Sequence, residues 1–231
     1  LRDLYKINNW VRSFDELENV KHLDGIILAI SSENLINVIP SISKLKIPCL
    51  IEKPLGINLE QSEKITHYLN LSDDIINYVG YNRRFYSSFL RAQEYIDKLG
   101  DPTSIHVDCP EPYYRLLKRG KKIEDVKNRL ILNTTHAIDF LTFLMGKPNF
   151  IYNLDHNSHR NGYQIDFMSV LKFDNNKTAS FISHWSSPGP WILKIYGEDY
   201  QIILNLTKNS GEVYSEEFGK TEISSTKDDT L

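Results

Sequence analysis

The sequence predicts an α/β protein in two parts. A parallel sheet with crossover helices is expected over residues 1–84, and an α+β region with a largely antiparallel open sheet over residues 85–231. The first part alternates short apolar runs with helical patterns, which is typical of parallel strands joined by helices. The second part holds several runs with the composition of β-strands, joined by turn residues, which is typical of antiparallel strands.

The first strand is expected over residues 25–30, where the continuous apolar run GIILAI is typical of a central strand with two buried faces. A helix should follow, because apolar residues recur at helical spacing. These residues are Leu35, Ile39, Ile42 and Leu45. Pro40 lies inside this pattern and is expected to kink or shorten the helix.

A second apolar run over residues 47–51 leads directly into Glu52-Lys53-Pro54, so two charged residues stand where a buried strand ends. In open α/β sheets the carboxyl ends of the strands face the ligand. A helix is expected from about Asn58, which has Gln61 three residues later as in a capping box, to about Leu69.

A third short strand is predicted at residues 77–80, followed by the segment YNRRF and by a helix over residues 87–99 that Gly100 ends. Five β-type runs then predict the second sheet, at residues 104–108, 163–173, 178–185, 191–196 and 201–206. Residues 174–177 and 197–199 have the composition of turns between them.

One helix interrupts the second sheet. Asn133 or Thr134 is expected to cap it, and Gly146 to end it. Its apolar stripe consists of Ala137, Phe140, Leu141 and Leu144.

The charge balance and the cysteines restrict the class of protein. The chain has 27 basic and 30 acidic residues, a net charge of −3, which gives no overall attraction to nucleic acid or an anionic membrane. The basic run at residues 118–122 contains no aromatic residue and is interpreted as a solvated loop. Cys49 and Cys109 suggest neither a disulfide framework nor a zinc site, and no stretch is apolar for the length of a membrane span. The sequence therefore predicts a soluble cytoplasmic protein.

Three motifs occur in order along the chain: EKP after a strand at residues 52–54, GYNRRF after a strand at residues 80–85, and His136-Ala137-Ile138-Asp139 where a helix opens. Together they resemble the Gfo/Idh/MocA family of nicotinamide-dependent oxidoreductases. The likeness extends from about Phe14 into the β-rich part. Residues 47–56 and 79–88 look most similar to bacterial members associated with surface-carbohydrate metabolism.

The resemblance implies a Rossmann domain that binds NAD or NADP, and a second domain that binds a sugar or nucleotide-sugar and takes part in a homo-oligomer. The family's Gly-rich loop, which holds a pyrophosphate at a helix N-terminus, does not occur among the 11 glycines. The chain also starts without Met, and a polar tail from Ser224 stands where family members continue. We therefore expect a fragment that begins partway through the Rossmann domain, and the choice between NAD and NADP stays open.

Lys53 is the first candidate catalytic residue. By residue type alone it is an exposed lysine after a strand. The resemblance implies that its ammonium lies between nicotinamide and substrate and donates to the reacting oxygen, with Glu52 and Pro54 beside the cofactor. Ser31 and Ser32 follow the first strand, where a contact with the dinucleotide and a helix cap are both open.

His136 is the second candidate catalytic residue, although by residue type alone a histidine in a first helical turn is more often structural. The resemblance implies that it takes the hydroxyl proton as hydride leaves, or returns it. The family's acidic residue three or four positions earlier is replaced here by Asn133 and Leu132. Asn133 can hydrogen-bond the imidazole but supplies no charge, which predicts slower or altered activity. Asp139 is interpreted as structural.

Further residues are expected on the substrate side. Asn82 and Arg84 match the family's substrate-side segment, where an arginine binds a carboxylate or phosphate, and a surface ion pair is the alternative. Asn133 is also expected there. Trp185 and Trp191 either stack on a sugar face or pack against the sheet.

The sequence leaves three possible functions open. The first is an NAD- or NADP-dependent oxidoreductase that acts on a sugar or nucleotide-sugar. The second is a lyase or glycosidase of the same family that reduces and reoxidises its cofactor within one turnover. The third is a non-catalytic sugar-binding or subunit-association module, which the missing Gly-rich loop and Asn133 favour.

Overall fold

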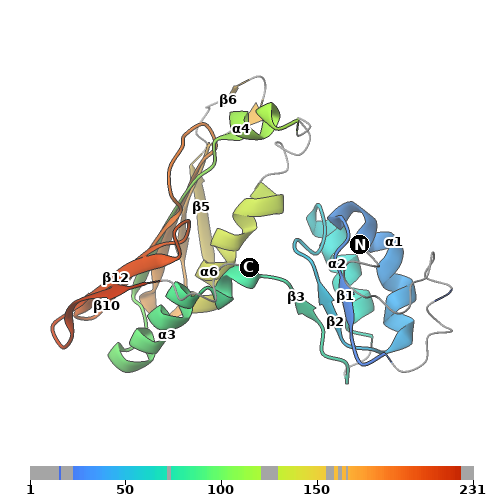
Figure 1. The fold of residues 1–231 in the computed structure, drawn as a ribbon, viewed down its shortest axis with the longest axis horizontal. Helices are drawn as coiled ribbons and strands as arrows, with labels where there is room; N and C mark the ends of the chain where they lie inside the picture. The colour runs from blue at the N-terminus through green and yellow to red at the C-terminus, as the bar shows by residue number, and fades with distance from the viewer. Residues whose placement is uncertain are drawn as a thin grey trace. The chain divides into compact units, whose positions relative to one another are not determined.

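The computed structural model describes residues 16, 23–71, 74–120, 130–154, 159–160, 163–164 and 166–224. The chain divides into two compact units, Leu1–Gly80 and Tyr81–Leu231 (Figure 1). The sequence predicts a division after residue 84 instead. The difference arises because side chains of the YNRRF segment bond within the second unit: Tyr81 to Thr135, and Arg84 to Asp139.

Within its described residues, the first unit contains a parallel sheet in the order β1-β2-β3 and the helices α1 and α2 (Figure 1). Its elements are β1 (Ile26–Leu28), α1 (Ser32–Ile42), the 3-10 turn η2 (Ser43–Leu45), β2 (Cys49–Ile51), α2 (Leu59–Leu69) and β3 (Tyr78–Val79). The parallel pairing of β2 with both neighbours confirms the predicted α/β class for this part.

The two faces of this sheet differ in burial. Leu28 and Ile51 are buried in a core with residues of α1 and α2. Ile27 and its strand partner Leu50 point to the opposite face and are 75% and 45% exposed. The prediction that the first strand is central and buried on both faces is therefore wrong for the described residues. An apolar run indicates that both faces of a strand can be buried. Whether both are buried depends on helices or strands from other parts of the chain, which the run itself does not reveal.

The helix signals of the first unit are largely confirmed. The side-chain oxygen of Asn58 accepts the backbone N–H of Gln61 at 2.9 Å, which caps α2. The side chain of Gln61 accepts from the backbone of Ile57 rather than Asn58, so the capping box is approximate. Pro40 lies inside α1, and the helix continues for two more residues to Ile42.

The second unit is built on an eight-stranded sheet in the order β13-β12-β11-β10-β4-β9-β8-β5. The strands are β4 (Ser104–Pro110), β5 (Phe150–Leu154), β8 (Asp166–Lys172), β9 (Thr178–His184), β10 (Ile192–Gly197), β11 (Tyr200–Asn205), β12 (Ser210–Ser215) and β13 (Gly219–Ile223). Only the β4–β9 pair in this sheet is parallel, so the largely antiparallel prediction is confirmed. A short hairpin pairs β6 (His159–Arg160) with β7 (Tyr163–Gln164).

Helices of the second unit are α3 (Ser87–Leu99), α4 (Tyr113–Lys118) and α6 (Thr135–Met145), with the short turns η3 (Asn82–Phe85) and η5 (Asp174–Asn176). A π-helical turn, η4 (Leu130–Thr134), runs directly into α6. Thr134 occupies the N-cap position of α6, as one of the two predicted alternatives, but its backbone angles are helical and its side chain makes no capping hydrogen bond. Asn133 lies one residue earlier, inside the π-helical turn.

One face of the large sheet packs against α3 and α6. Val107 of β4, Phe89 of α3 and Phe140 of α6 are completely buried, and the two phenyl rings lie 4.7 Å apart. The core therefore packs α6 against α3 and the sheet. No helix in the described ranges is long and apolar enough to cross a membrane.

Candidate functional site

The strand ends of the first unit carry the predicted cofactor-side residues. Ser31 and Ser32 follow β1, and Glu52-Lys53-Pro54 follows β2. Because the strands are parallel and in register, both groups lie at the same edge of the sheet. Ser31 occupies the N-cap position of α1 but makes no side-chain cap, since its Oγ accepts from the side chain of Asn34 at 2.9 Å.

Lys53 is half-buried at this edge, and Pro54 after it is buried. The backbone N–H of Lys53 donates to the carboxylate of Glu52 at 3.2 Å. The peptide bond between Lys53 and Pro54 is cis. Hydroxyl, carboxylate and ammonium groups at the carboxyl edge of a parallel sheet suit the ribose and nicotinamide of a dinucleotide, so the residues present fit this cofactor.

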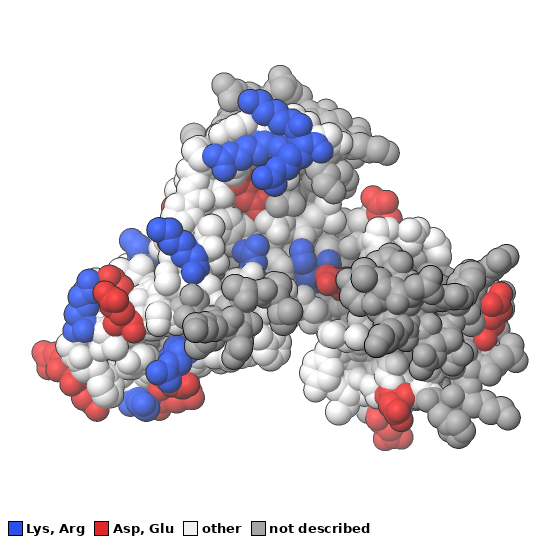
Figure 2. Space-filling view, viewed as in Figure 1, with Lys and Arg blue, Asp and Glu red and all other residues white. Residues whose placement is uncertain are grey.

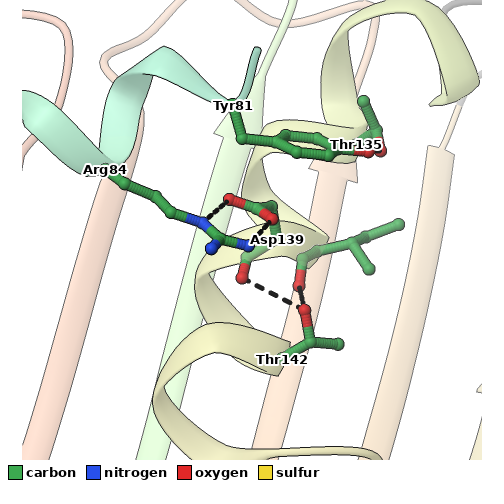
Figure 3. Close-up of polar contacts among 6 residues, drawn as sticks. Tyr81, Arg84, Thr135, Asp139 and Thr142 are labelled. Atoms are coloured by element: carbon green, nitrogen blue, oxygen red, sulfur yellow. Dashed lines mark hydrogen bonds and ion pairs between the residues drawn. The ribbon is translucent and has the colours of Figure 1, made fainter. Parts of the chain in front are cut away.

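His136 lies in the first turn of α6 and is only 4% exposed. The ring of Tyr81 meets its imidazole edge-on, with the ring centroids 5.8 Å apart. The Tyr81 hydroxyl in turn lies 3.2 Å from Oγ1 of Thr135. Figure 3 shows the Tyr81 ring beside Thr135. Tyr81 therefore contacts the first turn of α6 twice, through its ring at His136 and through its hydroxyl at Thr135.

Arg84 and Asp139 form a two-pronged ion pair, in which Nε donates to Oδ2 at 2.7 Å and Nη2 donates to Oδ1 (Figure 3). The hydrogen bond that the Arg84 guanidinium donates to Asp139 raises the pKa of the guanidinium. The guanidinium also lies 4.5 Å from the ring centre of Phe143. Of the two alternatives for Arg84, the structure shows the ion pair. Its guanidinium contacts Asp139 and Phe143 of the same unit.

A buried carboxylate that sequence reasoning missed lies beside Asn133. Glu111 is 6% exposed, and its Oε1 accepts a hydrogen bond from the side-chain amide of Asn133. The two residues are 22 positions apart in the chain. The signal that was available is a single acidic residue between Pro110 and Pro112 at the end of a predicted strand.

Trp185 is 1% exposed and packs against Phe167, with the ring centres 5.2 Å apart. Its ring is therefore packed against the sheet, which is one of the two alternatives that the sequence leaves open for this residue. Its Nε1, and the buried Oγ1 of Thr134, have no hydrogen-bond partner within the described ranges. Trp191 is also buried, with the Arg83 guanidinium 4.0 Å from its ring centre. Asn82 is exposed in η3.

A cavity of about 560 Å³ lies within the second unit, between η4, α6 and the strands β5, β8 and β9. Its lining is mainly apolar and includes Leu130, Ile138 and Phe167. The polar pair in its wall, Ser169 and Asn153, is joined by a 2.6 Å hydrogen bond. None of the sequence-predicted site residues is in this lining, so the cavity is separate from the candidate chemistry.

The fold defines a class of two-part proteins with a small parallel sheet and a larger, mostly antiparallel one. Neither a protein-family model nor a curated protein matches the sequence. Levoglucosan dehydrogenase in complex with NADH and L-sorbose matches 97% of this chain and 67% of its own, with 14% identity and a TM-score of 0.82.

Two further solved structures share this fold. UDP-N-acetylglucosamine 3-dehydrogenase from Acidithiobacillus ferrooxidans matches 95% of this chain and 68% of its own, with 14% identity and a TM-score of 0.77. An NAD-binding oxidoreductase from Klebsiella pneumoniae matches 92% and 64%, again with 14% identity and a TM-score of 0.77. The chain thus spans about two thirds of the length of these proteins, and the fold class is confirmed.

Proposed function

We propose that the protein is an NAD- or NADP-dependent oxidoreductase that acts on a hydroxyl or carbonyl group of a sugar or nucleotide-sugar. The observation that carries this proposal is the buried His136 at the N-terminal end of α6, held by Tyr81 and preceded by the Asn133–Glu111 pair. The shared fold with dehydrogenases that were solved with NADH and a sugar supports it.

In the proposed reaction, the substrate carbon loses a hydride and its hydroxyl loses a proton. A nicotinamide held at the strand ends of the first unit would supply the acceptor for this hydride and its two electrons. His136 takes the hydroxyl proton, because imidazole titrates near neutral pH. Lys53 supplies a positive charge that stabilises the developing negative oxygen. In the reverse direction His136 returns the proton to the oxygen.

The remaining proposed roles divide between the two units. Ser31, Ser32, Glu52 and Pro54 would contact the cofactor from the strand ends of the first unit. In the second unit, the exposed Asn82 and the half-buried Asn133 would hydrogen-bond sugar hydroxyls. Arg84 and Trp185 have no part in this proposal, because the ion pair with Asp139 engages the first and burial covers the second.

The cofactor is tested by titrating the intact product of the native gene with NADH and with NADPH. We expect saturable binding of at least one of them, and net reduction of the oxidised form when the correct sugar is added. Binding of neither overturns the proposal. Turnover without net reduced cofactor would indicate the lyase or glycosidase, and sugar binding without cofactor binding would indicate the non-catalytic module.

A cluster of positive charge favours a nucleotide-sugar over a neutral sugar as the substrate. Arg115, Lys118 and Arg119 are exposed on and directly after α4, and none of them has an acidic partner among the described residues. Figure 2 shows Lys and Arg side chains gathering at the end of the second unit where α4 lies in Figure 1. The backbone N–H of Tyr113, the first residue of α4, donates to the carbonyl of Trp185 at 2.8 Å, which anchors this helix to the sheet. A diphosphate is the anionic group that such a cluster would bind.

The double variant Arg115→Gln and Lys118→Gln is therefore expected to raise KM for a nucleotide-sugar about fivefold and to leave kcat unchanged. The expected effect is modest because both side chains are exposed. Steady-state kinetics at low and high salt would measure it, and salt should weaken substrate binding less in the variant than in the wild type. Lys172→Gln, at an exposed position on β8, is the matched control. An equal KM for the variant and the wild type would contradict the assignment.

A further inference from the structure

We propose that Glu111 is the positioning carboxylate of His136, and that it acts through the side-chain amide of Asn133. Its negative charge would orient the imidazole and stabilise the protonated form that appears when the substrate hydroxyl gives up its proton. This inference rests on the proposed function. It adds an acidic group that orients His136, because the residue at position 133 is an asparagine and carries no charge.

Glu111 is held in place directly after β4. It is 6% exposed, and a carboxylate is rarely buried to this extent without hydrogen-bonding partners. Its backbone N–H donates to the carbonyl of His184 at 2.7 Å, which extends the pairing of β4 with β9. Pro110 and Pro112 fix the backbone on either side. The carboxylate therefore has little freedom to turn away from Asn133.

Asn133 connects this carboxylate to the segment that carries His136. The π-helical turn that contains Asn133 runs without a break into α6. Asn133 is only three residues before His136 on this continuous segment. The amide that donates to Glu111 is therefore close to His136 along the chain.

The acidic residue nearest to His136 along α6 is not available for the same role. Asp139 is three residues after His136, but both of its oxygens accept from the guanidinium of Arg84. A carboxylate neutralised in this way adds little net negative charge at an imidazole. Glu111 is therefore the buried carboxylate best placed to balance a positive charge on His136.

Other charged groups surround Glu111 and would remain in place in the variants below. Asp108 precedes it on β4, and Arg83 of η3 acts electrostatically on Cys109 together with both acids. From the neighbouring strands, the imidazole Nδ1 of His184 lies 3.7 Å from Oδ1 of Asp166. Any change on removing the Glu111 charge is therefore measured against a constant background of these four groups.

The variant Glu111→Gln tests the role of the carboxylate charge separately from that of the hydrogen bond to Asn133. The glutamine keeps the size of the side chain and an oxygen that can accept from Asn133, so the fold and the hydrogen bond are expected to persist. The charge is lost. In Glu111→Gln combined with Asn133→Asp the hydrogen bond is reversed, because the Gln amide would donate to the Asp carboxylate. This double variant returns one negative charge to the pair, now carried by the residue at position 133 instead of position 111.

The first readout is the pH titration of the His136 ring, followed by NMR of protein labelled with ¹⁵N at histidine. Loss of the neighbouring negative charge should move the titration midpoint of His136 to lower pH in Glu111→Gln, and the double variant should move it back. This measurement needs neither substrate nor cofactor, so it tests the electrostatic link even if the proposed activity is wrong. An unchanged midpoint in Glu111→Gln overturns the inference.

The second readout is steady-state kinetics of the active enzyme. We expect kcat to fall about tenfold in Glu111→Gln with little change in KM. In the double variant kcat should rise again, whereas KM for the sugar should change, because Asn133 is also proposed to bind a sugar hydroxyl. A purely structural Glu111 predicts wild-type kcat for Glu111→Gln, since the hydrogen bond is kept. If the wild type reduces no cofactor with any sugar, the proposed function fails, whereas a wild-type kcat for Glu111→Gln in an active enzyme removes only the role of Glu111.

Discussion

Replacing His136 with Asn is expected to lower kcat by about 10²–10⁴-fold, the range typical for loss of a general acid or base. Asn can hydrogen-bond a substrate hydroxyl but cannot accept its proton at neutral pH, so binding should persist while proton transfer is lost. KM for the sugar and the dissociation constant for NADH are therefore expected to change little. Steady-state kinetics and a cofactor titration measure these quantities separately.

The burial of His136 makes a stability control necessary. At 4% exposure, its replacement could loosen the start of α6 and lower activity indirectly. The thermal unfolding midpoint of His136→Asn should therefore be compared with that of the wild type. His106→Asn is the matched variant, since His106 is a half-buried histidine of β4 that hydrogen-bonds Oγ of Ser180 at 2.8 Å. Equal losses of kcat in both variants, or no loss in His136→Asn, would contradict the role of His136 as the base.

Elements with a local chemical signal are the ones that the sequence predicts well. The helix α3 has the predicted bounds, 87–99, because its apolar stripe is followed by Gly100. The helix α2 begins where Asn58 can cap it. The strand ends at Ser31 and Lys53 also follow directly from the apolar runs before them. In each case the deciding residues are within a few positions of the element.

The parts that the sequence does not predict depend on contacts between distant segments. The strands β12 and β13 were not expected, because their residues are mostly polar and only pairing with β11 and with each other makes them strands. The short helix α4 was not expected either. The Arg84–Asp139 and Glu111–Asn133 pairs join residues 55 and 22 positions apart. Motif matching finds His136, but the groups that surround it become visible only in the folded chain.

The Arg84–Asp139 pair has a direct consequence for stability. The side chain of Asp139 is 7% exposed, whereas that of Arg84 is 33% exposed. Replacing Arg84 with Met leaves a buried carboxylate without its main counter-charge, so we expect the free energy of unfolding of the second unit to fall by about 2–3 kcal/mol. This value is below that of a fully buried pair, because water reaches part of the guanidinium.

The matched variants follow from the difference in exposure. Asp139→Asn leaves the guanidinium partly in water, so it should cost only about 1 kcal/mol. Arg84→Met combined with Asp139→Leu removes both charges, and its loss of stability should be smaller than that of Arg84→Met alone, because no buried charge is left without a counter-charge. Denaturant unfolding followed by tryptophan fluorescence would measure these values, since Trp185 and Trp191 are both buried in the second unit. A larger loss in Asp139→Asn than in Arg84→Met would show that burial of the carboxylate does not determine the cost of breaking the pair.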